Sequence, residues 1–309
     1  MNDLNIEAQN TISILMLAFN GGQDAIEAIE SLQHQRKFIN SIFISDNSST
    51  DNTRQIIEKK KDNLNITHVT PNENLGFAGG FNHLFDTALR ESTAEYFLVL
   101  NNDTEAEEGF LENLLREATP ERIVSPMILW HKDRKTVIQC AGSFNREMIK
   151  MDNLFAGLER EQVPAGVHQV EQTDGCCFLI HRSWLEKGFR FNPDLFIYFE
   201  DVDLFLRLGK AGVSFHYVSD SVLYHKEYGA SGGREKPSPF RNYYFYRNRL
   251  HIARLIHQVP KRWRIYWRLW RLAREKAKEI EREHPEAAGA IHRGIKDFFT
   301  GNMGRNLTP

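Results

Sequence analysis

Uninterrupted runs of apolar residues, each ending abruptly in polar side chains, are the dominant pattern in the first hundred residues. Runs of this length without alternation are typical of strands buried on both faces, as in a parallel sheet covered by helices. The runs that predict strands are residues 12–19 (ISILMLAF), 41–45 (SIFIS), 64–69 and 96–100 (YFLVL). They predict a sheet at the centre of the fold.

Amphipathic helical patterns separate these strands. After the first strand, Ala25, Ile26, Ile29 and Leu32 recur at helical spacing, and residues 81–89 repeat the pattern before the strand at 96–100. Strand, polar stop and helix recur about every 30 residues, which is the usual size of a βαβ unit. The sequence therefore predicts an α/β fold with a mostly parallel central sheet flanked by helices.

The pattern becomes less regular after residue 103. Residues 123–130 and 213–218 predict further strands, and a helix is expected to begin near Glu200. Residues 144–172 show no clean period. Long irregular segments often form binding loops, so we expect this one to pass over the active face.

The composition changes from Pro239 onward, which predicts a domain at residues 1–235 and a C-terminal helical extension at 236–309. On a helix, Trp263, Trp267 and Trp270 form one stripe with Tyr266, and arginines lie beside it. Aromatic residues interleaved with arginine suit an anionic membrane surface. The alternative is that the stripe packs onto the domain and leaves the arginines in solvent. The pattern slightly favours membrane contact.

Composition limits the possible classes of protein. The chain has 309 residues, of which 41% are hydrophobic and 26% charged, with a formal net charge of −2, so a nucleic-acid-binding protein is disfavoured. The three cysteines form no CxxC pair and no signal peptide is recognised, which predicts a reducing cytoplasmic compartment. No apolar run reaches the roughly 18 residues of a spanning helix. A peripheral place on the inner face of the membrane is compatible with this.

Acidic residues or histidine follow several of the predicted strands. In parallel sheets, ligands bind just beyond the carboxyl ends of the strands. Asp103, at the end of 96–103, is therefore placed to hold a hard cation or a phosphate-bearing ligand, unless Asn101-Asn102-Asp103 is merely a turn. Asp203 is expected to pair with Arg207 four residues later, which makes it structural.

Seven stretches together resemble the family 2 glycosyltransferases, and within them the rhamnosyltransferase-like branch. They are ILMLAFN, ISDNSSTDNT, NENLGFAGGFN, YFLVLNNDTE, DGCCFLIHR, FIYFEDVDLFLRLGKAG and HKEYGASGG, which occur in the order of the family and cover residues 12 to about 233. The resemblance implies a GT-A fold, a nucleotide-sugar donor, a divalent metal and transfer with inversion at the anomeric carbon.

The resemblance implies that Asp103 ligates the metal as the last residue of a DxD-type motif, with His225 as a second ligand. Mg²⁺ or Mn²⁺ bound by few protein groups, with phosphate and water completing the shell, fits this set. The first carboxylate of the motif is replaced by Asn101, so metal binding before the donor arrives is expected to be weak.

Further residues are expected to contact the donor. The resemblance implies that Asp46 accepts a hydrogen bond from the imide of uracil or thymine, and that glycines allow the backbone to approach the nucleotide. The full set is Phe19, Asn20, Asp46, Asn47, Asn74, Gly76, Gly79, Gly80, Asn82, Asn101 and Asn102.

The resemblance also implies that Asp201 is the catalytic base and that Glu200 binds the acceptor beside it. Inverting transfer needs one carboxylate that takes the proton of the attacking hydroxyl. Because a helix is expected to begin here, its N-terminal dipole should keep Asp201 ionised at neutral pH. No Ser, Cys or Lys nucleophile is needed.

The predicted activity is therefore transfer of a sugar, with rhamnose a candidate, from a UDP- or dTDP-sugar to a hydroxyl of a saccharide or lipid-linked glycan. Two alternatives remain: a sugar-phosphate nucleotidyltransferase, and an inactive nucleotide-sugar-binding protein. The first would normally have a basic residue in the loop after the first strand, which residues 20–24 lack. A homodimer and membrane contact through Trp263, Trp267 and Trp270 are compatible with the sequence.

Overall fold

A computed structural model describes residues 11–139, 142–226 and 237–307. The motif that follows His225 and the predicted boundary at 235/236 lie outside these residues. The strands are β1 Ile12–Ala18, β2 Ile39–Asp46, β3 Ile66–Val69, β4 Tyr96–Asn101, β5 Thr104–Ala106, β6 Arg122–Trp130, β7 Val137–Gln139, β8 Gly142–Asn145, β9 Lys150–Asn153, β10 Val167–Val170, β11 Cys177–His181 and β12 Ser214–His225.

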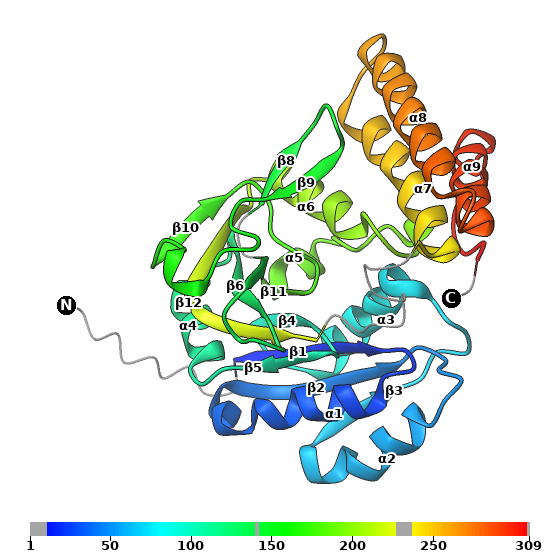
Figure 1. Ribbon diagram of the computed structural model, residues 1–309. Helices are drawn as coiled ribbons and strands as arrows, with labels where there is room; N and C mark the ends of the chain where they lie inside the picture. Colours follow the sequence, from blue (N-terminus) through cyan, green and yellow to red (C-terminus); the bar gives the residue numbers. More distant parts are fainter. Residues whose placement is uncertain (1–10, 140–141, 227–236, 308–309) are drawn as a thin grey trace.

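The α-helices are α1 Gly22–Ser31, α2 Thr53–Leu64, α3 Gly76–Glu91, α4 Phe110–Glu117, α5 Arg182–Glu186, α6 Glu200–Lys210, α7 Pro239–Ile256, α8 Lys261–Ile280 and α9 Pro285–Thr300. Short 3₁₀ helices occur at η1 Gln33–Phe38, η2 Arg160–Gln162 and η3 Pro193–Leu195. Figure 1 shows α7, α8 and α9 packed together at one side of the sheet.

One central sheet organises the fold, in the order β10-β12-β6-β11-β4-β1-β2-β3, and the α/β class is confirmed. The strands β4, β1, β2 and β3 pair in parallel, as their continuous apolar runs predict. The second half is mixed, because β11 runs antiparallel to both β4 and β6. The expectation of a mostly parallel sheet holds for β4, β1, β2 and β3 and for the β6–β12 pair, and it fails at β10 and β11, which run antiparallel to their neighbours.

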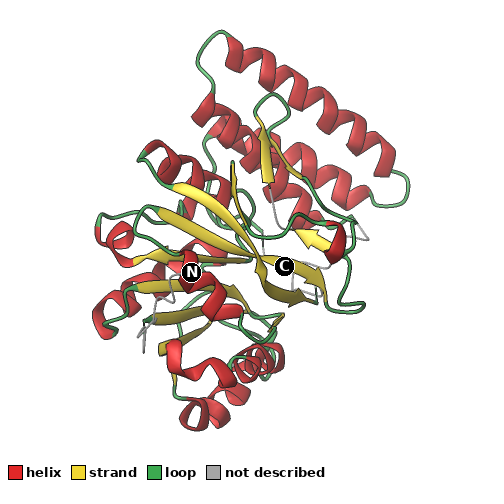
Figure 2. Cartoon of the chain, turned by 90° about the vertical axis from the view of Figure 1, so that its left-hand side faces the viewer, coloured by secondary structure: helices red, strands yellow, loops and turns green. Residues whose placement is uncertain are grey.

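Two apolar layers cover the sheet. One contains buried residues of α1, α2 and α4, and the other contains buried residues of α3, α5 and α6. Figure 2 shows the twisted strands fanning through the middle of the molecule with helices on both sides. This arrangement leaves the carboxyl ends of β1 and β4 as the edge at which polar side chains collect.

Three sequence predictions need correction. The helix expected over 81–89 is α3, which begins at Gly76 and so includes the glycine-rich segment. The strand expected over 213–218 continues through a bulge to His225 as β12. Residues 144–172 contain the β8–β9 pair and β10. These strands are four residues long and partly exposed, so they give no clear period.

The three C-terminal helices share a buried core of their own. In α8, Ile265, Leu269, Ala273 and Ala277 recur every four residues and face α7 and α9. The tryptophan stripe lies on a different face: Trp263 and Trp267 are each 60% exposed and Trp270 is 41% exposed. Tyr266, the remaining residue of the stripe, is 7% exposed and packs against Phe298 of α9, so the packing interpretation is wrong for the three tryptophans and holds for Tyr266. Among the described residues, none of the helices is long and apolar enough to cross a membrane.

Candidate active site

A cavity of about 680 Å³ opens at the carboxyl ends of β1 and β4, between the sheet and α7. It brings together predicted residues from six separate parts of the sequence. Those that line it are Phe19, Asn20, Asn47, Asn74, Gly76, Asn101, Asn102, Asp103, Glu200, Asp201 and His225. Most of the residues predicted from the sequence therefore line this one cavity.

The predicted metal ligands lie in contact at the base of the cavity. Asp103 follows β4, His225 ends β12, and His225 Nε2 lies 3.0 Å from Asp103 Oδ1. The next residue, Lys226, donates its amide to the Asp103 carbonyl at 2.9 Å, and its Nζ pairs with Asp24 and Glu27 of α1. These bonds fix the end of β12 against the end of β4.

The Asp103–His225 pair fits a divalent cation that is coordinated in part by a bound phosphate-containing molecule. A carboxylate oxygen and an imidazole nitrogen suit Mn²⁺, and Mg²⁺ would rely more on oxygen. No group of three or more His, Cys, Asp or Glu side chains that could hold a metal occurs within the described ranges. Donor phosphate and water would therefore have to complete the shell.

Amide side chains organise the donor side of the cavity. Asn47 donates to Asn74 Oδ1 and to the Gly76 carbonyl, both at 3.1 Å, and accepts from the Leu75 amide. Asn102 donates to the Gly21 carbonyl at 3.1 Å. Asn47 thus ties the loop after β2 to the segment after β3, and Asn102 ties the loop after β4 to the loop after β1.

Four predicted donor contacts lie away from the cavity. Asp46 is 2% exposed, and its Oδ1 accepts from the Ser49 amide at 3.0 Å, so it stabilises the turn after β2. Asn82 exchanges two hydrogen bonds with the backbone of Phe191. Gly79 and Gly80 lie inside α3, where added Cβ atoms would meet Leu75 and Leu17. Close packing of α3 explains both glycines without a nucleotide.

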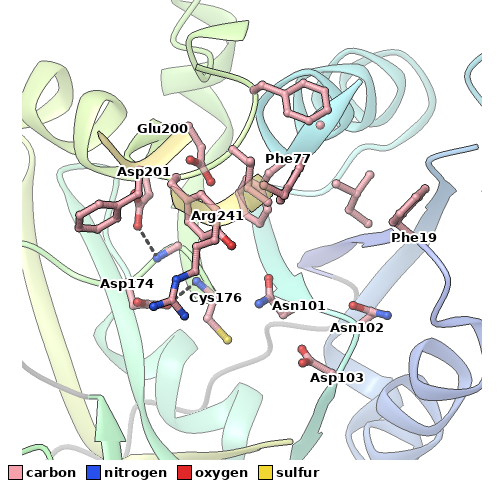
Figure 3. A pocket seen from close by; sticks show the side chains of 18 of the residues that line it. Phe19, Phe77, Asn101, Asn102, Asp103, Asp174, Cys176, Glu200, Asp201 and Arg241 are labelled. Carbon is pink, nitrogen blue, oxygen red and sulfur yellow. Dashed lines mark hydrogen bonds between the residues drawn. The ribbon is translucent and has the colours of Figure 1, made fainter. Parts of the chain in front are cut away.

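The predicted base is held in a fixed position in the first turn of α6. Asp201 Oδ1 accepts from the Val202 amide at 2.8 Å, and Oδ2 accepts from the Gly175 amide at 3.2 Å (Figure 3). A Cβ on Gly175 would lie 2.9 Å from the Cβ of Asp201. Only glycine at position 175 lets the backbone approach the carboxylate this closely.

Electrostatics at this carboxylate differ from the prediction. Burial, followed by the nearby Asp174 charge, raises the pKa of Asp201 to about 6. The predicted lowering of this pKa by the N-terminus of α6 is therefore smaller than the effect of burial. At pH 7 most of the carboxyl is still ionised, and it is a stronger proton acceptor than an ordinary aspartate.

Glu200 has a different environment. It is 5% exposed, and burial together with the Asp201 charge raises the pKa of Glu200 well above its usual range. Its Oε2 has no hydrogen-bond partner although it lines the cavity. A neutral carboxyl here can both donate to and accept from a ligand hydroxyl.

Asp203 is structural, as predicted. Its Oδ2 pairs with Arg207 Nη2 at 2.6 Å, and its Oδ1 lies 3.3 Å from Nε2 of His251 on α7. The histidine contact was not predicted, because nothing in the sequence links these two positions.

Sequence reasoning also missed residues that the extension contributes to the cavity. Arg241, Phe245 and Tyr246 of α7 and Lys276 of α8 line it, together with Asp174 before β11. Figure 3 shows Arg241 reaching toward Asp174, across the cavity from Asp103. The compositional change at Pro239 indicated a separate extension, and no motif marked its residues as part of the site, whereas Asp174 begins the stretch DGCCFLIHR and could have been singled out.

Comparisons with known proteins identify the family of the chain. The family model described as "Glycosyl transferase family 2" matches residues 13–189, which is more than half of the chain. The chain belongs to glycosyl transferase family 2. This glycosyltransferase is 24% identical over 257 residues to an N-acetylglucosaminyl-diphospho-decaprenol L-rhamnosyltransferase of Mycobacterium tuberculosis. The alignment covers 74% of this chain and 80% of that protein.

The chain is also similar to other glycosyltransferases. The glycosyltransferase is 24% identical to the low-salt glycan biosynthesis hexosyltransferase Agl10 of Haloferax volcanii, covering 66% of this chain and 63% of Agl10. Its fold is similar to GalNAc-T7 with UDP, GalNAc and Mn²⁺ (TM-score 0.59, 14% identity, 96% of this chain and 56% of that one). It is also similar to the mannosyltransferase PcManGT of Pyrobaculum calidifontis with GDP-Man and Mn²⁺ (TM-score 0.54, 15% identity, 95% and 80%). These likenesses confirm the GT-A fold.

Proposed function

We propose that this glycosyltransferase transfers one sugar, with rhamnose as the first candidate, from a UDP- or dTDP-sugar to a hydroxyl of a lipid-linked saccharide, with inversion. The observation that carries the proposal is that one cavity holds the Asp103–His225 pair at its base and Asp201 at its opposite side. The name of the Mycobacterium tuberculosis relative contains L-rhamnosyl and diphospho-decaprenol, which supports rhamnose as the sugar and a lipid-linked saccharide as the acceptor.

The residues suggest how the chain performs this reaction. The acceptor oxygen attacks the anomeric carbon, the bond from that carbon to the diphosphate breaks, and Asp201 takes the hydroxyl proton. Val202 and Gly175 hold the carboxylate in place for this transfer. Asp103 and His225 would hold a divalent cation, which when bound supplies positive charge next to the departing diphosphate.

Donor screening tests the proposal directly. Each nucleotide sugar is added with Mn²⁺, and the thermal midpoint is measured, because a ligand that binds only the folded chain raises it. We expect a UDP- or dTDP-sugar to give the largest shift and then to support transfer to a lipid-linked saccharide. A shift without any transfer would favour the inactive binding protein, and release of pyrophosphate from a nucleoside triphosphate and a sugar phosphate would favour the nucleotidyltransferase.

We predict that turnover depends on the ionisation of Asp201. Since the pKa of this carboxyl is about 6, log kcat should rise with pH at a slope of one below that value and level off above it. The measurement is kcat from pH 5 to 8 at saturating donor and Mn²⁺. A midpoint near 4, the value of an exposed aspartate, would mean that this buried carboxyl is not the base.

The exposed stripe on α8 (Trp263, Trp267 and Trp270) is proposed to bind an anionic membrane surface. The Arg271 guanidinium lies 5.3 Å from the Trp267 ring centroid, and that of Arg274 lies 5.5 Å from the Trp270 ring. Indole rings with adjacent arginines combine apolar burial with attraction to anionic lipid. A membrane position would bring the cavity to a lipid-linked acceptor.

Replacing the three tryptophans of this stripe by alanine should reduce binding to anionic vesicles at least tenfold, measured by sedimentation. The reason is that each apolar group buried in a membrane contributes about 0.8 kcal/mol per CH₂ to the free energy of binding. The thermal midpoint should change little, because these rings are exposed. The matched control is Leu154→Ala with Leu158→Ala, two other exposed apolar residues, which should leave vesicle binding unchanged. Equal losses in both variants would contradict a specific role for α8.

A further inference from the structure

The backbone directly before the proposed base is strained. Within the 194–199 segment, Phe196, Tyr198 and Phe199 have φ of +65°, +66° and +69°. Phe196 also has ψ of −62°, and the Ile197 amide donates to the Leu195 carbonyl at 2.7 Å, which makes a tight γ-turn. Bulky aromatic residues rarely adopt positive φ, and such strain persists only where the surrounding structure enforces it.

Two side chains of α7 enforce this conformation. Asn248 Nδ2 lies 2.8 Å from each of the carbonyl oxygens of Leu195, Ile197 and Tyr198. Arg247 Nη2 donates to the carbonyls of Asp194 and Leu195, at 2.9 and 3.0 Å, and its Nε donates to Asn248 Oδ1 at 2.9 Å. Both side chains are 0% exposed, so water does not compete for these carbonyls.

The same segment connects the two halves of the cavity. On one side, the Phe196 carbonyl accepts from the Ala78 amide at 3.1 Å, and the Phe196 ring lies where a Cβ of Gly76 would be. Gly76 lines the donor side. On the other side, Phe199 is the N-cap residue of α6, and its carbonyl accepts from the Asp203 amide at 3.0 Å. The position of Glu200 and Asp201 therefore depends on the path of this segment.

We propose that Arg247 and Asn248 are positioning residues for sugar transfer: they hold the 194–199 segment in its strained path and thereby aim the first turn of α6 at the cavity. The inference rests on the proposed role of Asp201 as base. It gives the helical extension a part in catalysis, because a 1 Å displacement of a reacting group can cost about 10²-fold in rate.

Arg249 provides a matched control for a purely structural effect. It is also a buried arginine of α7, and it donates to backbone carbonyls, here those of Met148 and Ile149 beside the β8–β9 hairpin. Those carbonyls lie outside the 194–199 segment. Lysine lacks the planar fork of arginine, so Arg247→Lys and Arg249→Lys each lose comparable hydrogen bonds without losing the charge.

The test compares Arg247→Lys, Asn248→Ala and Arg249→Lys in the full chain, at a temperature well below their melting midpoints. We expect kcat to fall about 10- to 100-fold in the first two variants, with donor KM changed by less than about threefold, because Asp103 and His225 lie on other elements. Amide exchange of residues 194–203 should become faster in the same two variants. Arg249→Lys should lose stability and keep kcat, with faster exchange only near residues 146–151.

Equal kcat losses in Arg247→Lys and Arg249→Lys, or near-wild-type kcat in Asn248→Ala, would overturn the proposal. Should Arg247→Lys fail to fold, Asn248→Ala alone decides. If the unmodified chain transfers no sugar, it is the proposed function that fails. The amide exchange rates of residues 194–203 then test the role of Arg247 and Asn248 without any activity measurement. Unchanged exchange rates in Asn248→Ala would overturn the positioning role of this pair.

Discussion

Replacing Asp201 by asparagine is expected to lower kcat for sugar transfer by about 10² to 10⁴, the usual contribution of a general base. Asparagine keeps the size of the side chain and one acceptor for the amides of Val202 and Gly175, but it cannot accept a proton. Donor affinity should barely change, because Asp201 lies across the cavity from Asp103 (Figure 3). Both quantities are measured on the same preparation, transfer by product formation and donor affinity by calorimetry.

Two variants control this experiment. Asp203→Asn should cost stability, through its lost pairing with Arg207 and His251, and leave turnover nearly intact. Glu200→Gln introduces a neutral side chain at a position where burial raises the pKa of the carboxyl well above its usual range, so kcat should fall less than in Asp201→Asn. An inactive Glu200→Gln beside an active Asp201→Asn would place the base at Glu200. Full activity in both would remove the pair from the mechanism.

The stability of Asp201→Asn gives a readout that does not depend on activity. Because folding raises the pKa of Asp201 from 3.8 to about 6, the native chain is penalised for this charge fully above pH 6 and not at all below about pH 3.8. The variant carries no such charge. It should therefore become more stable relative to the wild type as pH rises from 4 to 7, measured as the difference between their thermal midpoints.

Replacing Asp103 by alanine is the second change expected to have a large effect. It removes the carboxylate of the proposed metal pair, and positive charge at a departing diphosphate contributes several kcal/mol, so transfer should fall by about 10²-fold or more. His225→Ala should act in the same direction but less, since water can replace one ligand of a partly aqueous shell. Calorimetric titration of UDP or dTDP with and without Mn²⁺ measures the metal-dependent part of donor affinity.

Asp152→Ala is the matched control, because this carboxylate lies on β9 and pairs only with Lys150 among the ion pairs of the described residues. It should leave metal-dependent nucleotide binding unchanged. If Asp103→Ala also binds the nucleotide with unchanged metal dependence, Asp103 is not the ligand and the role assigned to the Asp103–His225 contact is wrong.

The sequence predicted best what depends on short-range pattern. Buried parallel strands such as β1 and β4 contain continuous apolar runs, and their polar ends placed Asn20 and Asp103 at the cavity. Gly79 and Gly80 were expected at the nucleotide because the family resemblance implies glycines there, whereas in α3 an added Cβ would meet Leu75 at position 79 and Leu17 at position 80. Glycine content alone does not distinguish these two needs.

What the sequence did not predict depends on contacts between distant residues. The pKa of Asp201 reflects burial and Asp174, 27 positions earlier (201 − 174), and no local pattern reports either. Arg241 and Lys276 belong to an extension that composition set apart from the domain, yet both line the cavity. The strained 194–199 segment has no sequence signal, because its aromatic residues favour other backbone conformations.

The contacts of Arg247 also bear on when the site forms during synthesis. Its Nη1 donates to the Gly304 carbonyl at 2.7 Å, while its Nη2 holds Asp194 and Leu195. On a ribosome, β1 to β4 can pair as soon as they emerge, whereas the segment before Asp201 lacks the contacts of Arg247 and Asn248 until α7 has been made, and the Gly304 contact of Arg247 comes last. A nascent chain that stalls after β12 would thus contain the proposed base without the two side chains that hold the backbone before it.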